Sequence, residues 1–203
     1  MIYISKGDFV MIFTIAITII LCLVFIGIFY NLYVQLIKKR NKVKEAMSGI
    51  DVQLNKRYSL IPNLFKSAAK YMEHERDLLE NITSLRSQAA SIKSVDEKSV
   101  AQKIELDKKI TAGMGQFFVS VENYPQLKAD GPIIQTMQTY SEIEEHIAAA
   151  RRFYNSAVNE LNNATEIFPS SLVAMFIGVK SYPFFEADEQ VKKEINVSDY
   201  FNK

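Results

Sequence analysis

An uncharged apolar segment near the N-terminus constrains this chain more than any other feature of its sequence. From Phe9 to Tyr30 there are 22 residues without a charge, and 19 of them are hydrophobic. As a helix they would extend over about 33 Å, enough to cross a hydrocarbon core of roughly 30 Å. The apolar region of a cleaved signal peptide is shorter, about 7 to 15 residues. We therefore predict a membrane span that stays as an anchor, and we exclude a freely soluble protein.

Basic residues gather on the C-terminal side of this segment. Between Lys38 and Tyr58 there are seven basic residues and two acidic ones, whereas from position 59 onward 16 basic residues face 20 acidic ones. Basic residues collect on the cytoplasmic side of a span, so we expect residues 1–8 outside and the remaining domain in the cytoplasm. The mildly acidic remainder argues against nucleic acid as a partner. Contact of the basic cluster with anionic lipid headgroups stays open. The membrane-flanking basic residues are Lys38, Lys39, Arg40, Lys42 and Lys44.

Helical periodicity dominates the rest of the chain. Apolar residues recur at steps of three and four over residues 43–82, 100–121 and 133–168, and a short apolar segment follows at 172–179. No alternating strand pattern of convincing length is present. The sequence therefore predicts an all-α fold, in which a single N-terminal transmembrane helix (9–30) is followed by an antiparallel long-helix bundle of the four-helix type (31–179).

Helix-breaking and helix-capping residues, and the aromatic residues of the tail, refine this prediction. Pro62 predicts a kink or break in the first long helix, because proline removes one backbone hydrogen bond. Asp96 and Ser99 are candidate caps of the next helix. The tail, residues 180–203, carries two aromatic pairs that we expect to dock on the bundle, with partner binding as the alternative. These aromatic residues are Phe184, Phe185, Tyr200 and Phe201.

Two kinds of site are disfavoured by residue type and position. The only cysteine, Cys22, lies inside the apolar segment, which excludes an internal disulfide, a cysteine-based zinc site and a thiol catalyst in the rest of the chain. Gly113 and Gly115 follow no strand, so a phosphate-binding loop is disfavoured, and we expect a bend or a close approach to a neighbour instead.

The two histidines do not form a recognisable metal motif. A di-iron bundle needs Glu-x-x-His, but the residues three before His74 and His146 are Tyr71 and Ile143. A mixed site from His146 and the nearby glutamates 142 and 145 is geometrically possible, although a solvated helix face is the plainer interpretation. We predict no catalytic, cofactor-binding or metal-binding residue, and no cofactor.

Polar residues next to the apolar stripes are more informative. Charged and amide groups at the margin of a core are costly unless they are satisfied, and when satisfied they fix which helices pair. We favour this structural role over a ligand site and expect Asp51 to meet Arg151 or Arg152. The residues concerned are Asp51, Gln53, Arg57, Asn63, Arg151, Asn155, Asn159 and Asn162.

Several motifs resemble the LemA family of bacterial membrane proteins. They include I-D-V-Q-L at 50–54, L-I-P-N-L at 60–64 and E-N-Y-P-Q-L-K-A at 122–129, and the resemblance extends from position 30 to the C-terminus. Met47 departs from the family, which usually has tryptophan there. The motif residues carried by this chain are Asn41, Asp51, Gln53, Arg57, Pro62, Asn63, Tyr124, Pro125, Arg151, Tyr154, Asn155, Phe168 and Pro169.

The resemblance implies an N-terminal span and a helical bundle at the bacterial inner membrane, and it implies no reaction. We expect a structural or scaffolding role through self-association, with the lipid bilayer and further copies of this chain as partners. An adaptor for another membrane protein, such as a protease or a secretion component, is the alternative. A membrane-held enzyme or metal-binding bundle is the remote one. All of these predict that the span is retained as a single-pass anchor.

Overall fold

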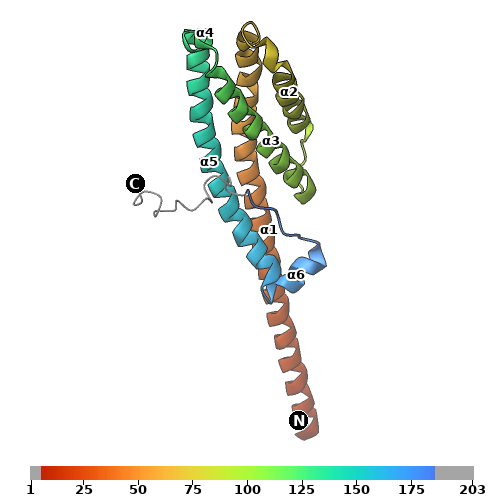
Figure 1. The fold of residues 1–203 in the computed structure, drawn as a ribbon. Coiled ribbons are helices and arrows are strands. Elements are labelled where there is room, and N and C mark those ends of the chain that lie inside the picture. The colour runs from red at the N-terminus through yellow and green to blue at the C-terminus, as the bar shows by residue number, and fades with distance from the viewer. Residues whose placement is uncertain (1–5, 186–203) are drawn as a thin grey trace, which may run out of the picture. The chain divides into compact units, whose positions relative to one another are not determined.

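The structure is a computed structural model that describes residues 6–185, with side chains from residue 11 onward. The predicted all-α fold with one long apolar N-terminal helix is confirmed, and the described residues contain no strand. The elements in Figure 1 are α1 (Lys6–Ala68), the 3-10 helix η1 (Glu73–Glu75), α2 (Arg76–Ser91), α3 (Glu97–Val121), α4 (Pro125–Lys128), α5 (Gly131–Glu166) and α6 (Ser170–Ile177).

The first helix is longer than the sequence suggests. α1 runs for 63 residues and continues through Pro62, so of the expected kink or break, a break at the proline itself is absent. The helix ends six residues later at Ala68, and η1 then leads into α2. The apolar stripe of residues 43–82 is therefore divided between two helices.

Two helix ends are fixed by specific residues. Asp96 caps the N-terminus of α3, as predicted, because its carboxylate accepts hydrogen bonds from the backbone N–H groups of Lys98 and Ser99. These bonds and those from the hydroxyls of Ser94 and Ser99 hold the pKa of Asp96 below its usual range. Gly178 ends α6 with φ 67°, a left-handed conformation that glycine adopts without a steric penalty.

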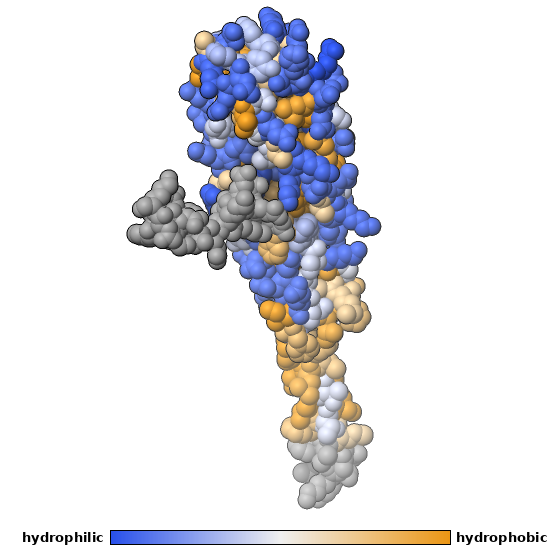
Figure 2. Space-filling view, in the orientation of Figure 1, coloured by the Kyte–Doolittle hydropathy of each residue, from blue (hydrophilic) through white to orange (hydrophobic). Residues whose placement is uncertain are grey.

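The chain divides into two compact units, which we describe separately. The first contains the described residues 6–45 and 157–182. In it α1 is long and apolar enough to cross a membrane, and its side chains from Met11 to Tyr30 are exposed. Figure 2 shows this part of α1 as an orange surface. Further along, Leu36 and Leu161 are buried where α1 and α5 pack together.

The second unit contains the described residues 46–156 and 183–185. Its core combines α1, α2, α3 and α5, and buried side chains include Ile50, Ile61, Ile110 and Ile147. A row of aromatic contacts links three helices. The ring of Phe65 on α1 lies 5.2 Å from that of Phe117 on α3, and a further contact leads through Phe118 to Tyr140 on α5 at 5.3 Å.

Gly113 allows α3 to approach α2 closely. A Cβ added at Gly113 would lie 2.8 Å from Cγ1 of the buried Ile82, a distance that real side chains do not tolerate. At Gly115 nothing lies within 4 Å of such an atom. The expected close approach is therefore found at the first glycine and not at the second.

Candidate functional site

One arginine is fully buried in the second unit. Arg57 occupies a position of the apolar stripe of α1 between Leu54 and Ile61, and its side chain is 0% exposed. Its guanidinium donates to one carboxylate oxygen of Asp107 on α3 and, at 2.7 Å, to Glu144 on α5. A buried charge is costly unless it is paired and hydrogen-bonded, so these acidic partners are what makes its burial possible.

A second arginine completes this arrangement, which we call the Arg57 cluster (Arg57, Asp107, Glu144 and Arg151). Arg151 on α5 donates to the other carboxylate oxygen of Asp107, so each oxygen of that buried acid accepts from an arginine. Two positive and two negative side chains leave the cluster formally neutral. The side chains of Arg151 and Glu144 are 22% and 27% exposed, so the cluster extends from the core to the surface of the bundle.

Arg57 and its two tyrosine neighbours each keep a single protonation state near neutral pH. Burial alone would lower the pKa of Arg57, but the attraction of Asp107 and Glu144 outweighs it and the pKa is raised. Burial raises the pKa of Tyr58 to about 12 and raises that of Tyr140 as well. Arg57 therefore stays charged and both phenols stay neutral near pH 7. None of these three groups therefore exchanges a proton near pH 7.

Asp51 does not pair with Arg151 or Arg152, and that expectation is wrong. Its two carboxylate oxygens accept from the ammonium of Lys103 on α3 at 2.7 and 2.8 Å. Lys103 is itself 5% exposed. The pairing partner lies on α3 because the buried stripe of that helix carries a lysine and an aspartate, one turn apart, that face α1.

Two asparagines of α5 bind the chain that follows α6 instead of pairing with another helix. In the second unit, Asn155 accepts from the backbone N–H of Phe185 at 2.9 Å and donates to its carbonyl at 2.8 Å. In the first unit, Asn162 makes the same two bonds with the backbone of Tyr182, at 2.9 and 3.0 Å. Each amide satisfies one extended residue completely, which resembles the pairing of two strands.

Aromatic contacts reinforce this attachment. The hydroxyl of Tyr154 donates to the carbonyl of Pro183 at 2.9 Å, and its ring lies edge-on to Phe185 at 5.3 Å. The guanidinium of Arg151 lies 5.4 Å from the centre of the Phe185 ring. Phe184 is half exposed, and the other two tail aromatics, at positions 200 and 201, lie outside the described residues.

The remaining motif residues are scattered. Tyr124 donates to Glu75 at 2.7 Å, a bond that raises the pKa of the tyrosine, and Gln53 is half-buried. Several motif residues, together with Asn159, which we expected at the margin of the core, are exposed instead. They are Asn41, Pro62, Asn63, Pro125, Asn159 and Pro169, and Phe168 is exposed with them.

Part of the membrane-flanking basic cluster is engaged with α5. Glu160 accepts from Lys42 at 2.8 Å and lies 3.7 Å from Lys39, and these contacts lower the pKa of the glutamate. Lys38 and Lys44 are exposed, and Arg40 is half-buried. At least two of the five basic residues thus join helices within the first unit.

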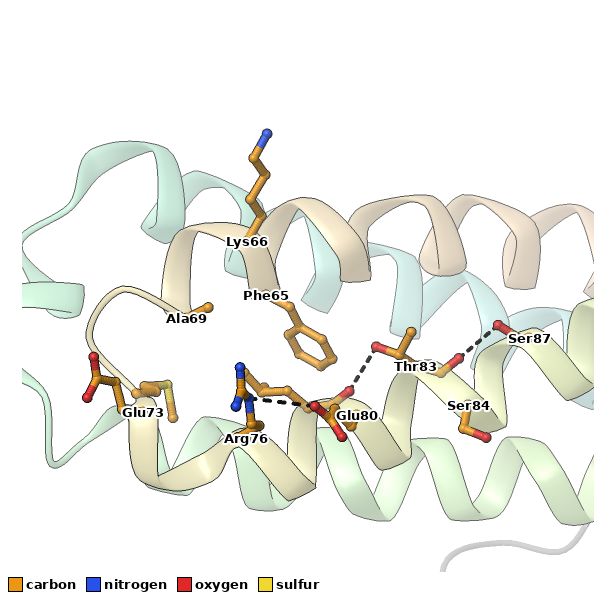
Figure 3. Close-up of a pocket in the computed structure, with 11 residues that line it drawn as sticks. Phe65, Lys66, Ala69, Glu73, Arg76, Glu80, Thr83, Ser84 and Ser87 are labelled. Atoms are coloured by element: carbon orange, nitrogen blue, oxygen red, sulfur yellow. Dashed lines mark hydrogen bonds and ion pairs between the residues drawn. The ribbon is translucent and has the colours of Figure 1, made fainter.

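Two other places could serve as sites. His74 and His146 are exposed, and the described residues hold no group of three metal-binding side chains. A groove of about 900 Å³ lies between the end of α1 and α2. Figure 3 shows Phe65 pointing into it, with Arg76 and Glu80 at its edge, 3.6 Å apart. Buried Met72 and Leu79 also line it, so its floor is apolar and its rim charged.

Three members of these networks were missed by the sequence reasoning: Asp107, Lys103 and Glu144. The signal was present for the first two. Counting back from Ile110 on the apolar stripe of α3 in steps of three and four reaches Asp107 and then Lys103, so two charged residues occupy stripe positions. Ile104, the apolar residue beside Lys103, would be the expected member of that stripe, but it is only half-buried.

Comparison with known proteins places these residues in a family context. The model of the LemA family matches residues 46–198. A protein described as Protein LemA from Metamycoplasma hominis is 29% identical over 181 residues, which cover 87% of this chain and 81% of that protein. The matched region contains the whole Arg57 cluster and both asparagines that bind the segment after α6.

Proposed function

The chain belongs to the LemA family, and its described residues include one helix able to span a membrane. On this basis we propose that it is a single-pass membrane scaffold that acts by self-association. In this proposal the chain has no reaction of its own. It presents a helical bundle at the membrane surface, where copies of the chain gather.

The observation that carries the proposal is the continuity of α1. The same helix holds the exposed apolar residues 11–30 and, from Val43 to Ala68, a stripe of side chains buried in the bundle. A helical anchor that continues into the domain without a loop suits a protein whose task is mechanical. A tethered enzyme has no need of such continuity, because a flexible linker would serve it equally well.

The Arg57 cluster supports a structural role. Its charges compensate one another, and they link three helices, with Arg57 on α1, Asp107 on α3, and Glu144 and Arg151 on α5. Buried ionic groups of this kind fix which helices pair and in which register, whereas they add little net stability compared with apolar residues.

The span offers a surface for self-association. Ala16 and Gly27 are 11 residues apart, which on a helix of 3.6 residues per turn places them within about 20° of the same face. Small residues on one face let two membrane helices approach closely. A Cβ added at Gly27 would meet nothing within 4 Å, so this face is open in a single copy.

Location and orientation are part of the proposal. The basic residues that follow the span favour a bundle on the cytoplasmic side of the bacterial inner membrane. A single cysteine placed at Ser94, in the link before α3, tests this with Cys22 changed to serine. In cells with an accessible but intact inner membrane, a membrane-impermeant thiol reagent should fail to label it. Labelling would reverse the orientation.

An adaptor is the second candidate, and the groove between α1 and α2 favours it. The apolar floor formed by Phe65, Met72 and Leu79 would accept an apolar side chain of a partner protein, with Arg76 and Glu80 binding polar groups around it. In this case the scaffold would hold a different protein instead of further copies of itself.

Co-isolation of two tagged forms of the full-length chain separates these candidates. Both forms are expressed in the same cells, extracted in mild detergent and purified through one tag. We expect the second form to be recovered in substantial amount. Cells that each express one form and are mixed before extraction serve as the control for exchange after lysis.

Two outcomes would contradict self-association. If only the captured form is recovered, the chain does not associate with itself under these conditions. If the captured form comes with a different protein at a fixed ratio, the adaptor is supported. Leu79→Glu, which places a charge on the groove floor, should then release that partner, whereas Val119→Glu on the exposed face of α3 should not.

A further inference from the structure

A bare apolar surface lies where α5 ends and α6 follows. Residues 167–177 contain no charged side chain. Five large apolar side chains among them are exposed in the described structure: Ile167 (60%), Phe168 (74%), Leu172 (50%), Met175 (78%) and Phe176 (81%). Exposed apolar residues are normal when they are scattered, but a cluster of this density indicates a surface that contacts something apolar.

α6 is one-sided, and its outer side is the apolar one. Val173 and Ala174 are buried against the first unit, and the N–H of Val179 donates to the carbonyl of Ala174 at 3.0 Å to fasten the end of the helix. Positions 172, 175 and 176 share the opposite face by helical spacing. Without a covering partner, the apolar side chains of this face would be exposed to water.

The depth of this surface can be worked out from contacts within the first unit. α5 runs antiparallel to α1 there (Figure 1), and the salt bridge between Lys42 and Glu160 places these two residues at the same level. Seven residues beyond Glu160, Ile167 lies about 10 Å closer to the span. Gln35 lies seven residues before Lys42 on α1, so it is at about the same level as Ile167.

Gln35 is five residues, or about 7 Å, from Tyr30 at the end of the predicted span. The headgroup layer of one leaflet is about 5 to 8 Å thick, so Ile167, from which the segment to Phe176 continues, falls at this layer when α1 spans the membrane. Tyr30 and Tyr33, 66% and 40% exposed, lie on α1 between the end of the predicted span and the level of Ile167. Tyrosines are enriched at this depth in membrane proteins.

We propose that residues 167–176, at the α5–α6 junction, insert their exposed apolar side chains into the interfacial layer of the leaflet from which α1 emerges. This second membrane contact rests on the proposed anchoring of α1 and adds to it. The occupant is lipid rather than a second protein, because the anchor fixes the surface at the level of the lipid headgroups. The exposed Lys38, on the next turn of α1, suits anionic headgroups just above.

Figure 2 is consistent with this placement within the first unit. The surface over α6 is coloured toward the hydrophobic end of the scale and continues into the orange surface of α1. The apolar band therefore widens at the level of α6, from one helix to two elements. An anchor with this shape resists tilting in the bilayer better than a single helix does.

The test uses the absence of tryptophan in the chain. A tryptophan introduced by Phe176→Trp is the sole one, and full-length protein is reconstituted in liposomes of zwitterionic and anionic lipids, with or without bromine on the upper acyl chains. Brominated lipid quenches tryptophan on contact. We expect emission from Phe176→Trp to fall by about half or more, as for an interfacial side chain. Met175→Trp should behave alike.

Two control variants make each outcome decisive. Val119→Trp, at an exposed site on α3 (68%), should keep its emission in brominated lipid. Phe25→Trp, at an exposed site in the span (70%), should be quenched. If Phe25→Trp is quenched and neither Phe176→Trp nor Met175→Trp is, the inference is overturned while the anchor stands. If Phe25→Trp is not quenched either, the anchoring itself is wrong.

One further outcome would also overturn the inference. Blue-shifted emission from Phe176→Trp without quenching by brominated lipid would mean that protein covers this surface. A second copy of the chain would then be the occupant.

Discussion

Neutralising Asp107 is the sharpest test of the Arg57 cluster. The change Asp107→Asn keeps the shape of the side chain and removes its charge. Asp107 is 2% exposed and accepts from both Arg57 and Arg151. In the variant, one amide oxygen can still accept, but the amide nitrogen is a donor and faces an arginine that is also a donor. The cluster then holds two arginines and a single carboxylate, that of Glu144, which contacts Arg57.

The size of the effect follows from this geometry. Breaking a buried ion pair by removing one partner costs about 3 to 5 kcal/mol, because the other charge is left uncompensated. Since Arg57 is 0% exposed, water cannot replace the lost partner. For a chain of this length, 3 to 5 kcal/mol corresponds to a melting temperature lower by about 6 to 20 °C.

The assay is urea unfolding of the full-length protein in a non-ionic detergent, followed by circular dichroism at 222 nm. Glu105→Gln is the matched control, because Glu105 is on the same helix, pairs with Lys109 at 3.3 Å and is 61% exposed. It should change the unfolding free energy by less than about 0.5 kcal/mol. A cost of Asp107→Asn as small as that of Glu105→Gln would refute the reasoning.

A double substitution tests what the cluster is for. Replacing the pair by Arg57→Met and Asp107→Leu removes both buried charges, and Glu144 and Arg151 can turn toward solvent because they are partly exposed. Apolar replacements of buried ion pairs are often neutral or stabilising, so the double variant should lie within about 2 kcal/mol of the wild type. A cost equal to that of Asp107→Asn would mean that the cluster itself provides net stability.

Three further predictions concern single positions. Gly113→Ala should destabilise the protein by about 1 to 3 kcal/mol in the same urea assay because its Cβ would meet Ile82, whereas Gly115→Ala should be neutral or stabilising by up to about 1 kcal/mol; equal effects would count against the close approach. The folded state holds the pKa of Tyr58 at about 12, against an ordinary value of 10.0, so the stability linked to the neutral phenol is complete below pH 10 and is lost as the pH rises toward 12. Tyr58→Phe should therefore lose about 2 to 3 kcal/mol less unfolding free energy than the wild type across that range. Parallel curves of unfolding free energy against pH would contradict this. Asn155→Ala should speed chymotrypsin cleavage near Phe185 by about ten- to a hundredfold, since two hydrogen bonds to that residue are lost, while Asn159→Ala, exposed on the same helix, should leave the cleavage rate unchanged.

The sequence was sufficient for the class of fold, because helical periodicity is a local property. The stripes around Ile61, Ile110 and Ile147 predict buried faces, and these side chains are fully buried. The helix end at Ala68 was missed since Pro62 is a stronger local signal than anything near Ala68. Tertiary packing keeps the helix intact through the proline, at the expense of one backbone hydrogen bond.

The polar contacts were predicted in kind but not in detail. Arg57 was expected to find a partner across helices, and it does, but which acid it meets depends on the rotation of α3. Gly113 of α3 packs closely on Ile82 of α2, and the identity of such a neighbour, which lies far away in the sequence, is not given by local periodicity. The role of Asn155 also depends on a segment 30 residues away along the chain, for which spacing on α5 gives no indication.

The most direct test of the proposed scaffold is the native mass of the full-length protein extracted in mild detergent, with all co-purifying chains identified in the same sample. One copy has a mass of 23.2 kDa. We predict a uniform species whose protein mass is a multiple of this value, with many copies and no other chain. A single copy, or one or two copies bound to a different protein at a fixed ratio, would contradict self-association as the basis of its function.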